Sequence, residues 1–490
     1  MAEVPEPVRG VVVPETGGAR STSALGRAVV ADALRAVDPV GARGAESATV
    51  WRRDYLLHFR RLVEAGLLSP DAALGIARDG LASLHLRMRF AAAGEERPVA
   101  EALTAEPAGE PLATATLTGG GSAQRELVLP YHGERLRRAE LRRQLDRWVA
   151  AGVVESSCAE AVRLVADNPD WLDLSDRRVV VLGAGAEMGP LTALLRWGAE
   201  VIAVDLPRPA LWQRLIETAN RYAGRLRVPV AGDPAGPDLA RRAGADLVDD
   251  PGRIATWLAG FDGPLVLGNY VYAEGAMNLR VAMAVDALTE HLLARRTDLA
   301  LAFLATPTDV FAVPADAVNE ATRRYAEAGG IGRIRRPLRI LSGGRLLARN
   351  YPPGADPGIN DCLVPQQGPN YALAKRLQRW RATAARAAGT TVCLTVAPAT
   401  RTRSVLRNRL LAAAFAGAHR FGMEVFEPAT SNTLMAALLV HHLRTAPPAQ
   451  PHPWMDEAYA AAHGGLWRQP YAPRSVLGIA VLLGIGAARG

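Results

Sequence analysis

The feature that most constrains the fold is an alternation of short apolar runs with amphipathic helical segments, which begins at Asp176. Strands that alternate with helices along a chain assemble into a parallel sheet with helices on both faces. The sequence therefore predicts an α/β fold with a doubly wound parallel sheet. The predicted strands are Val179–Leu182, Glu200–Val204, Arg227–Val230, Pro264–Leu267, Leu299–Ala305 and Thr391–Val396.

A glycine-rich turn follows the first of these strands and precedes a helical pattern. Gly183 permits a tight turn, Gly185 lets the backbone approach a phosphate, and Gly189 lets the helix pack closely on the strand. Asp205 ends the next strand, 22 residues after Gly183, where a carboxylate would hold the ribose hydroxyls of an adenosine group. A carboxylate there repels a 2′-phosphate, so NAD is favoured, while Arg208 keeps NADP open as an alternative. We therefore expect a Rossmann-like nucleotide-binding domain.

The glycine-rich turn by itself is compatible with more than one function. S-adenosylmethionine-dependent methyltransferases begin with a similar turn and an acid after the second strand, and Asn269-Tyr270 is similar to residues of their fourth-strand loops. A redox-inert nucleotide-binding sensor or scaffold is a further alternative. A second group of residues is needed to choose among these classes.

That second group is Tyr371 and Lys375, which lie four residues apart in a helical pattern. Of the 57 basic residues, 56 are arginine, and Lys375 is the one lysine. Arginine can replace lysine wherever a permanent charge suffices, but it cannot supply a compact ammonium that titrates. Residues four apart share a helix face, and a nearby ammonium lowers the pKa of a phenol. The pair therefore predicts proton transfer by Tyr371 with support from Lys375.

On these residues, the segment from about 177 to 440 resembles the short-chain dehydrogenase/reductase superfamily. Gly185 and Gly189 match glycines of that family's turn, and Tyr371 and Lys375 match its Tyr-x-x-x-Lys pair. The resemblance implies an NAD(P)-dependent oxidoreductase that moves hydride between the nicotinamide and the carbonyl or alcohol group of a small-molecule substrate. It also implies that Lys375 binds the cofactor ribose and that Asn269 orders the surroundings of Lys375. Cofactor contacts are implied for Gly183, Gly185, Gly189, Asp205, Asp246, Leu247, Gly268, Lys375, Pro398 and Thr402.

The chain departs from that family where its catalytic serine normally lies. The fifth predicted strand leads instead into Thr306 and Thr308, and an insertion at about 310–365 separates them from Tyr371. The hydroxyl of Thr306 is our candidate to hold the substrate oxygen, with Thr308 and Ser342 as alternatives.

The region before the predicted sheet has a different pattern. Residues 1–45 are rich in glycine, alanine and proline with weak periodicity, which predicts a mobile arm. Residues 46–172 predict a mainly helical extension, with helical spacing over 51–89 and 136–166. Residues 173–490 would form the catalytic domain. The extension is a candidate lid or oligomerisation element, and we expect a homo-oligomer.

Composition argues against several classes of function. The net charge is +8, but the arginines form short clusters beside acidic residues, so we expect no nucleic-acid partner. No apolar run reaches the length of a membrane span and the first residues lack an apolar signal core, so we expect a cytoplasmic protein without a membrane anchor. Three widely separated cysteines and the lack of a His-x-x-x-His motif predict neither a disulfide framework nor a metal site.

Overall fold

The computed structural model describes residues 8–106, 109–327 and 330–485. Within that part of the chain, the central element is a seven-stranded sheet with the order β16-β13-β12-β9-β10-β11-β6. All neighbours pair in parallel except β6, which runs antiparallel to β11 at one edge. The parallel strands are β9 (Arg178–Leu182), β10 (Glu200–Val204), β11 (Arg225–Ala231), β12 (Leu265–Asn269), β13 (Leu299–Ala305) and β16 (Val392–Val396).

Counted along the chain, these parallel strands have the spatial order 3-2-1-4-5-6, which is the order of dinucleotide-binding sheets. Each of them matches one predicted strand, so the predicted α/β class with a parallel sheet is confirmed. The strands could be predicted from their apolar runs, because strands that are covered on both faces carry nearly continuous apolar sequence.

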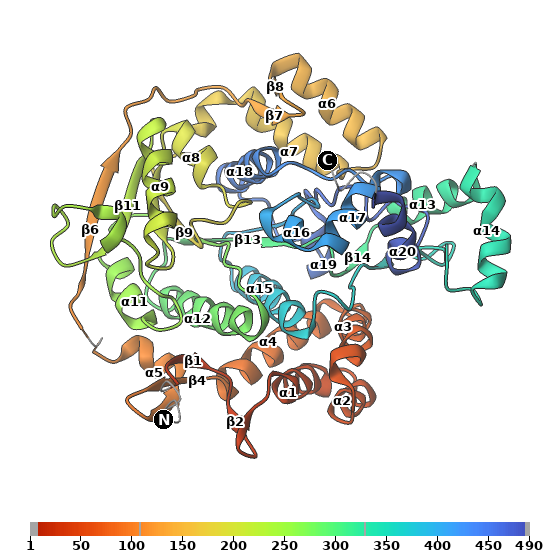
Figure 1. Cartoon of the computed structure of the whole chain (residues 1–490), viewed down its shortest axis with the longest axis horizontal. Helices are drawn as coiled ribbons and strands as arrows, with labels where there is room; N and C mark the ends of the chain where they lie inside the picture. Colours follow the sequence, from red (N-terminus) through yellow and green to blue (C-terminus); the bar gives the residue numbers. More distant parts are fainter. Residues whose placement is uncertain (1–7, 107–108, 328–329, 486–490) are drawn as a thin grey trace.

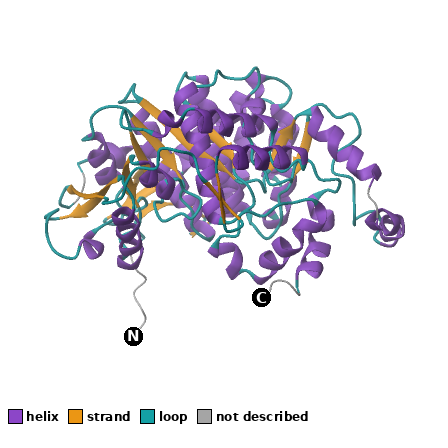
Figure 2. Cartoon of the chain, turned by 90° about the horizontal axis from the view of Figure 1, so that it is seen from above, coloured by secondary structure: helices purple, strands orange, loops and turns teal. Residues whose placement is uncertain are grey.

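Helices cover both faces of the sheet, and each face has its own apolar core (Figure 1; Figure 2). The side chains of β9 alternate between the two cores, with Val180 and Leu182 in one and Val179 and Val181 in the other. The first core is closed by α1 (Thr22–Arg35), α3 (Trp51–Gly66), α4 (Pro70–Arg87), α11 (Pro251–Ala259), α12 (Gly275–Leu293) and α15 (Pro369–Ala387). The second is closed by α6 (Arg138–Ala150), α7 (Ser156–Asp167), α8 (Leu191–Trp197), α9 (Pro209–Arg221) and α18 (Pro428–Thr445).

The predicted mobile arm is wrong for its second half. Helix α1 occupies 22–35, and α2 (Pro39–Glu46) follows it. Ser21 caps α1 by accepting a hydrogen bond from the backbone N–H of Ala24 at 3.2 Å, and Leu34 of the same helix is fully buried. The alanines and glycines that blurred the periodicity allow close helix packing. Residues 1–7 lie outside the described residues.

The predicted division between an extension and a catalytic domain at residue 172 also fails. The helices expected over 51–89 and 136–166 are present as α3, α4, α6 and α7. However, β6 (Leu112–Thr118) completes the central sheet through seven paired positions with β11. The apolar side chains of α1, α3 and α4 belong to the same core as those of α12 and α15. The N-terminal region is therefore a part of the sheet domain and its packing.

The insertion predicted at about 310–365 contains ordered elements. Strands β14 (Val310–Val313) and β15 (Gly358–Asp361) pair antiparallel, and between them lie α13 (Ala315–Glu327) and α14 (Gly330–Leu341). Helix α14 lies at the outer edge of the molecule (Figure 1).

A membrane-spanning helix would need a long apolar stretch, and none of the helices in the described residues has one. Short elements complete the chain. Before the sheet lie β1 (Gly10–Val12), β2 (Glu15–Thr16), β3 (Ala19–Arg20), β4 (Arg89–Ala92), β5 (Glu95–Pro98), α5 (Val99–Thr104), β7 (Leu129–Tyr131) and β8 (Glu134–Leu136). Within and after it lie α10 (Leu239–Arg242), α16 (Arg403–Arg407), α17 (Arg409–Ala418), α19 (Pro453–Ala458) and α20 (Pro473–Gly484).

A buried ion pair joins α12, α15 and α4. The carboxylate of Asp286 accepts two hydrogen bonds from Arg381, each 2.8 Å long, and contacts Nε2 of His85 at 2.7 Å. Only 4% of Asp286 is exposed, and its cationic partners hold the pKa of the carboxyl at about 2 despite that burial. Because a buried charge without a partner is costly, each member of the pair depends on the other.

We expect Asp286→Asn to lower the free energy of unfolding by about 3–5 kcal/mol, because Arg381 would keep its buried charge without a counter-charge. Urea unfolding monitored by tryptophan fluorescence measures the change. The control is Glu46→Gln, which breaks a solvent-exposed pair with Arg35 and should change the free energy of unfolding far less. Equal effects of the two variants would contradict the prediction.

Candidate functional site

The predicted site residues lie at one edge of the sheet, because the carboxyl ends of parallel strands meet there. Gly183 follows β9, Asp205 follows β10, Asn269 ends β12, Thr306 follows β13, and Pro398 lies two residues after β16. The strand order reverses between β9 and β12: β10 and β11 lie on one side of β9, and β12, β13 and β16 lie on the other. Such a switch point is where doubly wound sheets bind ligands.

The glycine-rich turn and Asp205 are in direct contact. Gly183 adopts a positive φ of 80°, and a Cβ there would lie 3.0 Å from the backbone of Tyr270. The carboxylate of Asp205 accepts hydrogen bonds from the backbone N–H groups of Gly185, at 2.7 Å, and of Leu206, at 2.8 Å. Burial raises the pKa of this carboxyl, and the two N–H donors partly offset the shift.

The helix after the turn starts later than the glycine pattern indicates. Helix α8 begins at Leu191, two residues beyond Gly189, and it has only seven residues. The glycines of this segment therefore allow neighbouring backbone and side chains to approach closely, and none of them is the first residue of the helix.

The cofactor contacts predicted at Asp246 and Leu247 fall on a turn next to Asp205. The N–H of Ala245 donates to the backbone carbonyl of Asp205 at 3.0 Å, which places the following residues beside the acid. The carboxylate of Asp246 accepts from the N–H of Val248 at 2.8 Å and so stabilises its own turn. Leu247 is buried in the first apolar core.

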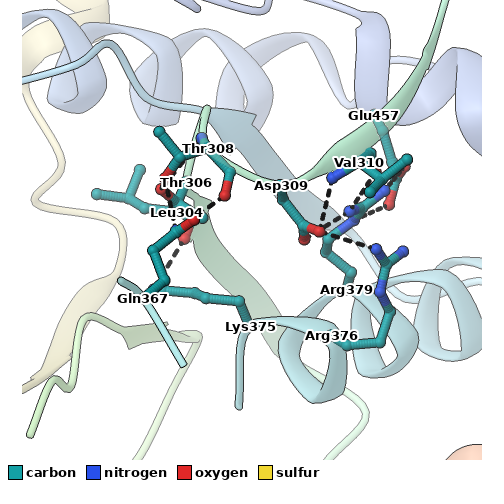
Figure 3. A network of polar contacts seen from close by, with 10 residues as sticks. All are labelled: Leu304, Thr306, Thr308, Asp309, Val310, Gln367, Lys375, Arg376, Arg379 and Glu457. Carbon is teal, nitrogen blue, oxygen red and sulfur yellow. Dashed lines mark hydrogen bonds and ion pairs between the residues drawn. The ribbon is translucent and has the colours of Figure 1, made fainter. Parts of the chain in front are cut away.

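Helix α15 brings Tyr371 and Lys375 to the same edge of the sheet (Figure 3 shows Lys375). Nζ of Lys375 donates to the carbonyl of Leu304 at 3.3 Å and to Oε1 of Gln378 at 3.2 Å. Nε2 of Gln378 in turn donates to Oδ1 of Asn269 at 3.2 Å. Asn269 is thus linked to Lys375 through Gln378, which the sequence did not reveal, although its place three residues after Lys375 on one helix face was a usable signal.

The expected effect of Lys375 on the phenol of Tyr371 is wrong in this structure. The pKa of Tyr371 is raised to about 12, mainly by burial, while the adjacent hydroxyl of Thr306 lowers it. The ring of Tyr371 also packs edge-on against Tyr272, with centroids 6.1 Å apart. The helical spacing was interpreted correctly, but the ammonium turns toward the acceptors at Leu304 and Gln378.

The loop after β13 is held by side-chain hydrogen bonds (Figure 3). The hydroxyls of Thr306 and Thr308 lie 2.9 Å apart. Nε2 of Gln367, two residues before α15, donates to both the carbonyl and the hydroxyl of Thr308, at 2.9 and 2.8 Å. This loop and the start of α15 therefore form one connected unit, with Thr306 beside Tyr371.

A buried ionic cluster lies directly beyond this loop (Figure 3). Asp309 accepts from Arg376 at 2.9 Å and from Arg379 at 2.7 Å, and Arg379 also pairs with Glu457 of α19. Asp309 is 1% exposed and the two arginines are 5% and 3% exposed. Sequence reasoning missed this cluster, because its members come from three distant segments.

The segment after β16 crosses to the glycine-rich turn. The N–H of Ala397 donates to the carbonyl of Ala305 at 3.0 Å, which holds Pro398 beside the end of β13. The hydroxyl of Thr402 lies 2.9 Å from that of Ser404. Glu187 in the glycine-rich turn accepts from the backbone N–H and from Nε of Arg403, at 2.7 and 2.8 Å.

The ring of Tyr270 explains the glycine at 268, since a Cβ there would lie 2.4 Å from the ring. Ser342 lies in the insertion, where its hydroxyl accepts from the N–H of Leu346 at 3.0 Å.

Within the described ranges, no group of three or more histidine, cysteine, aspartate or glutamate side chains is arranged to hold a metal ion.

Comparisons with known proteins add little to this geometry. No family model matches the chain, and no curated protein matches its sequence. Among solved structures, it is similar to the terminal R domain from the myxalamid PKS-NRPS biosynthetic pathway, with 14% sequence identity and a TM-score of 0.28. The match covers 52% of this chain and 60% of that one. The chain therefore spans less than two thirds of the neighbour's length, and overlap at this level defines no family.

Lys375 is half-buried, and the protein around it lowers the pKa of its ammonium from 10.5 to about 8 because it disfavours the charged form. We expect this titration to be directly visible, since protein grown with ¹³C-lysine carries the label at a single side chain. The chemical shift of the ¹³Cε nucleus, followed against pH, should show a midpoint near 8. A midpoint near the ordinary value of 10.5 would contradict this lowering of the pKa.

Proposed function

We propose that the protein is an NAD(P)-dependent oxidoreductase that transfers hydride between a nicotinamide and a carbonyl or alcohol substrate. The observation that carries the proposal is the convergence of two independent patterns at one sheet edge. The turn at Gly183 and the carboxylate of Asp205 lie after β9 and β10, while α15 brings Tyr371 and Lys375 to the ends of β12 and β13. Neither pattern alone would choose this chemistry.

The residues of the turn fit a dinucleotide. At Gly185 a Cβ would come within 3.3 Å of the Asp205 carboxylate and 3.0 Å of Leu211, so a side chain there would crowd the turn. The carboxylate is held by backbone donors and can accept further hydrogen bonds from the ribose hydroxyls of the adenosine group. Its negative charge favours NAD over NADP.

The nicotinamide, when bound, supplies or accepts the hydride. The chain's own groups handle the proton and orient the substrate. With a pKa of about 12, the phenol of Tyr371 is protonated at neutral pH and can donate to a carbonyl oxygen, which fits carbonyl reduction. The hydroxyl of Thr306 beside it can donate a second hydrogen bond to the same oxygen. Lys375 would bind the ribose next to the nicotinamide.

We expect NAD and NADH to raise the melting temperature, while S-adenosylmethionine and S-adenosylhomocysteine leave it unchanged. A ligand at about 100 times its Kd stabilises by roughly 2.7 kcal/mol, which for a chain of this size is about 3 °C. Thermal shift with all six compounds, including NADP and NADPH, measures the effect. A response to the adenosylmethionine pair alone would replace this proposal by a methyltransferase.

Asp205→Ala should abolish the preference for NAD over NADP, because the carboxylate that repels a 2′-phosphate is removed. The matched control is Asp262→Ala, an exposed aspartate just before β12 at the opposite edge of the sheet. If Asp205→Ala binds both dinucleotides as the unmodified protein does, the assigned ribose site is wrong.

Tyr371→Phe should lower turnover by about 10²–10⁴-fold, the usual contribution of a general acid, while dinucleotide binding is retained. Lys375→Arg should also lower turnover, because a guanidinium neither fits nor titrates as the ammonium does. The assay is the loss of NADH or NADPH absorbance with a panel of aldehydes and ketones. Tyr222→Phe, distant from these residues, is the control. Unchanged turnover in Tyr371→Phe would leave nucleotide binding without the proposed acid.

A further inference from the structure

Helices α17 and α20 pack against each other through small residues. A Cβ at Gly417 would collide with the backbone carbonyl of Ala480, and one at Gly484 would collide with that of Ala413. The backbones of the two helices are therefore in contact, and the last turn of α20 meets the first turns of α17. Nearly all buried residues of the pair are small: Ala413, Ala414, Gly417 and Ala418 on α17, and Ser475, Val476, Ala480 and Gly484 on α20.

Large apolar side chains at this end of the pair lie in solvent. Leu482 and Leu483 of α20 are 71% and 53% exposed. An amphipathic helix of a water-soluble protein usually does the reverse, with its leucines toward the core and its polar residues outside. We call the exposed apolar side chains here the apolar patch, and they are Leu406, Leu410, Leu482, Leu483 and Ile485.

The segments that carry the apolar patch also carry positive charge. Residues 401–423 contain five arginines and, like residues 458–485, no aspartate or glutamate. Arg407 and Arg409 lie beside the patch leucines in sequence and are exposed. Within the part of the chain that the structure describes, neither of them forms an ion pair with a carboxylate, so both guanidinium groups are available to an external anion.

Helix α14 has the same character and shares a small apolar core with α20. Leu338 of α14 and Ile479 of α20 both pack against that core, and the two helices lie on the same side of the molecule (Figure 1). Residues 330–349 contain six arginines and no acidic residue. Ile340 and Leu341, at the end of α14, are exposed. Two neighbouring elements thus combine arginine with apolar side chains in solvent.

An anionic lipid surface matches both properties. Guanidinium groups bind phosphate in the headgroup layer, while apolar side chains enter the boundary with the acyl chains. Helices in lipid also pack through small residues, as α17 and α20 do. A second copy of this chain matches less well, because a symmetric contact would set the same arginines against each other. A nucleic acid would attract the arginines but would leave the leucines without an apolar partner.

We propose that the apolar patch and its two exposed arginines dock the protein on an anionic phospholipid surface, with Leu482 and Leu483 in the interfacial layer. Such docking needs no spanning segment, because a helix that lies in the interface binds by one face. Nε of Arg403, in α16, contacts Glu187 of the glycine-rich turn at 2.8 Å, so the docked face adjoins the candidate site. The proposal does not depend on the proposed function, and its tests need no substrate or cofactor.

Vesicle flotation tests the docking directly. The probes are vesicles of phosphatidylcholine and phosphatidylserine in equal parts, compared with vesicles of phosphatidylcholine alone. We expect the unmodified protein to float with the anionic vesicles and not with the neutral ones. Binding should fall as salt is raised, because counter-ions screen the arginines. Binding to neither kind of vesicle, or equal binding to both, overturns the proposal.

Leu482→Ser combined with Leu483→Ser should lower the affinity for the anionic vesicles about tenfold or more, because the apolar contacts are lost. The melting temperature should stay the same, since both side chains are exposed. The matched control combines Leu68→Ser with Leu86→Ser, which are 72% and 69% exposed near the two ends of α4. The control should bind as the unmodified protein does. Unchanged binding of the first variant, or an equal loss in both, overturns the proposal.

Arg407→Gln combined with Arg409→Gln should also weaken binding and reduce its dependence on salt. The control combines Arg78→Gln with Arg143→Gln, which removes the same charge from exposed positions on α4 and α6. If the control weakens binding as much, the net charge of the protein is responsible, and the proposal is overturned.

Light scattering without vesicles separates lipid docking from self-association. We expect the same mass for the unmodified protein and for the variant with Leu482→Ser and Leu483→Ser. A change from an oligomer to a monomer in that variant would assign the apolar patch to a contact between copies and would overturn the proposal.

Discussion

Burial of charged side chains on α15 is the constraint on which much of this structure depends. Arg376, Arg379 and Arg381 all enter the protein interior from one helix, and a buried charge is tolerated only with a partner of opposite sign. The partners come from far apart, with Asp309 after β13, Glu457 on α19 and Asp286 on α12. The ion pairs of this one helix therefore hold segments from across the chain in defined positions.

The N-terminal helices take part in the same arrangement. Helices α1, α3 and α4 share an apolar core with α15, and His85 of α4 completes the pair around Asp286. Gly80 of α4 lies so close to the ring of Trp380 that a Cβ would approach it to 2.4 Å. The N-terminal region thus covers the helix that carries Tyr371 and Lys375, and a boundary at residue 172 has no physical basis.

The parallel strands could be predicted because their signal is local. An apolar run buried on both faces can be identified from five or six neighbouring residues, and the chain order then determines which strand ends share an edge. Strand β6 was not predicted in this way, because Leu112–Thr118 alternates apolar residues with threonine and has no continuous apolar run; it pairs with β11 over seven positions. The ion pairs of Asp309 could not be predicted either, because no regular sequence spacing relates residue 309 to residues 376 and 457.

The same distinction explains the outcome for Tyr371 and Lys375. Their place on one helix follows from spacing, but the direction of the ammonium follows the acceptors at Leu304 and Gln378. Arginine serves elsewhere on this helix, where each guanidinium pairs with a carboxylate and remains charged. At position 375 the hydrogen-bond partners are two neutral oxygens, and the ordinary pKa is lowered to about 8. A guanidinium would remain charged at this position, whereas an ammonium with a pKa of about 8 can lose its proton.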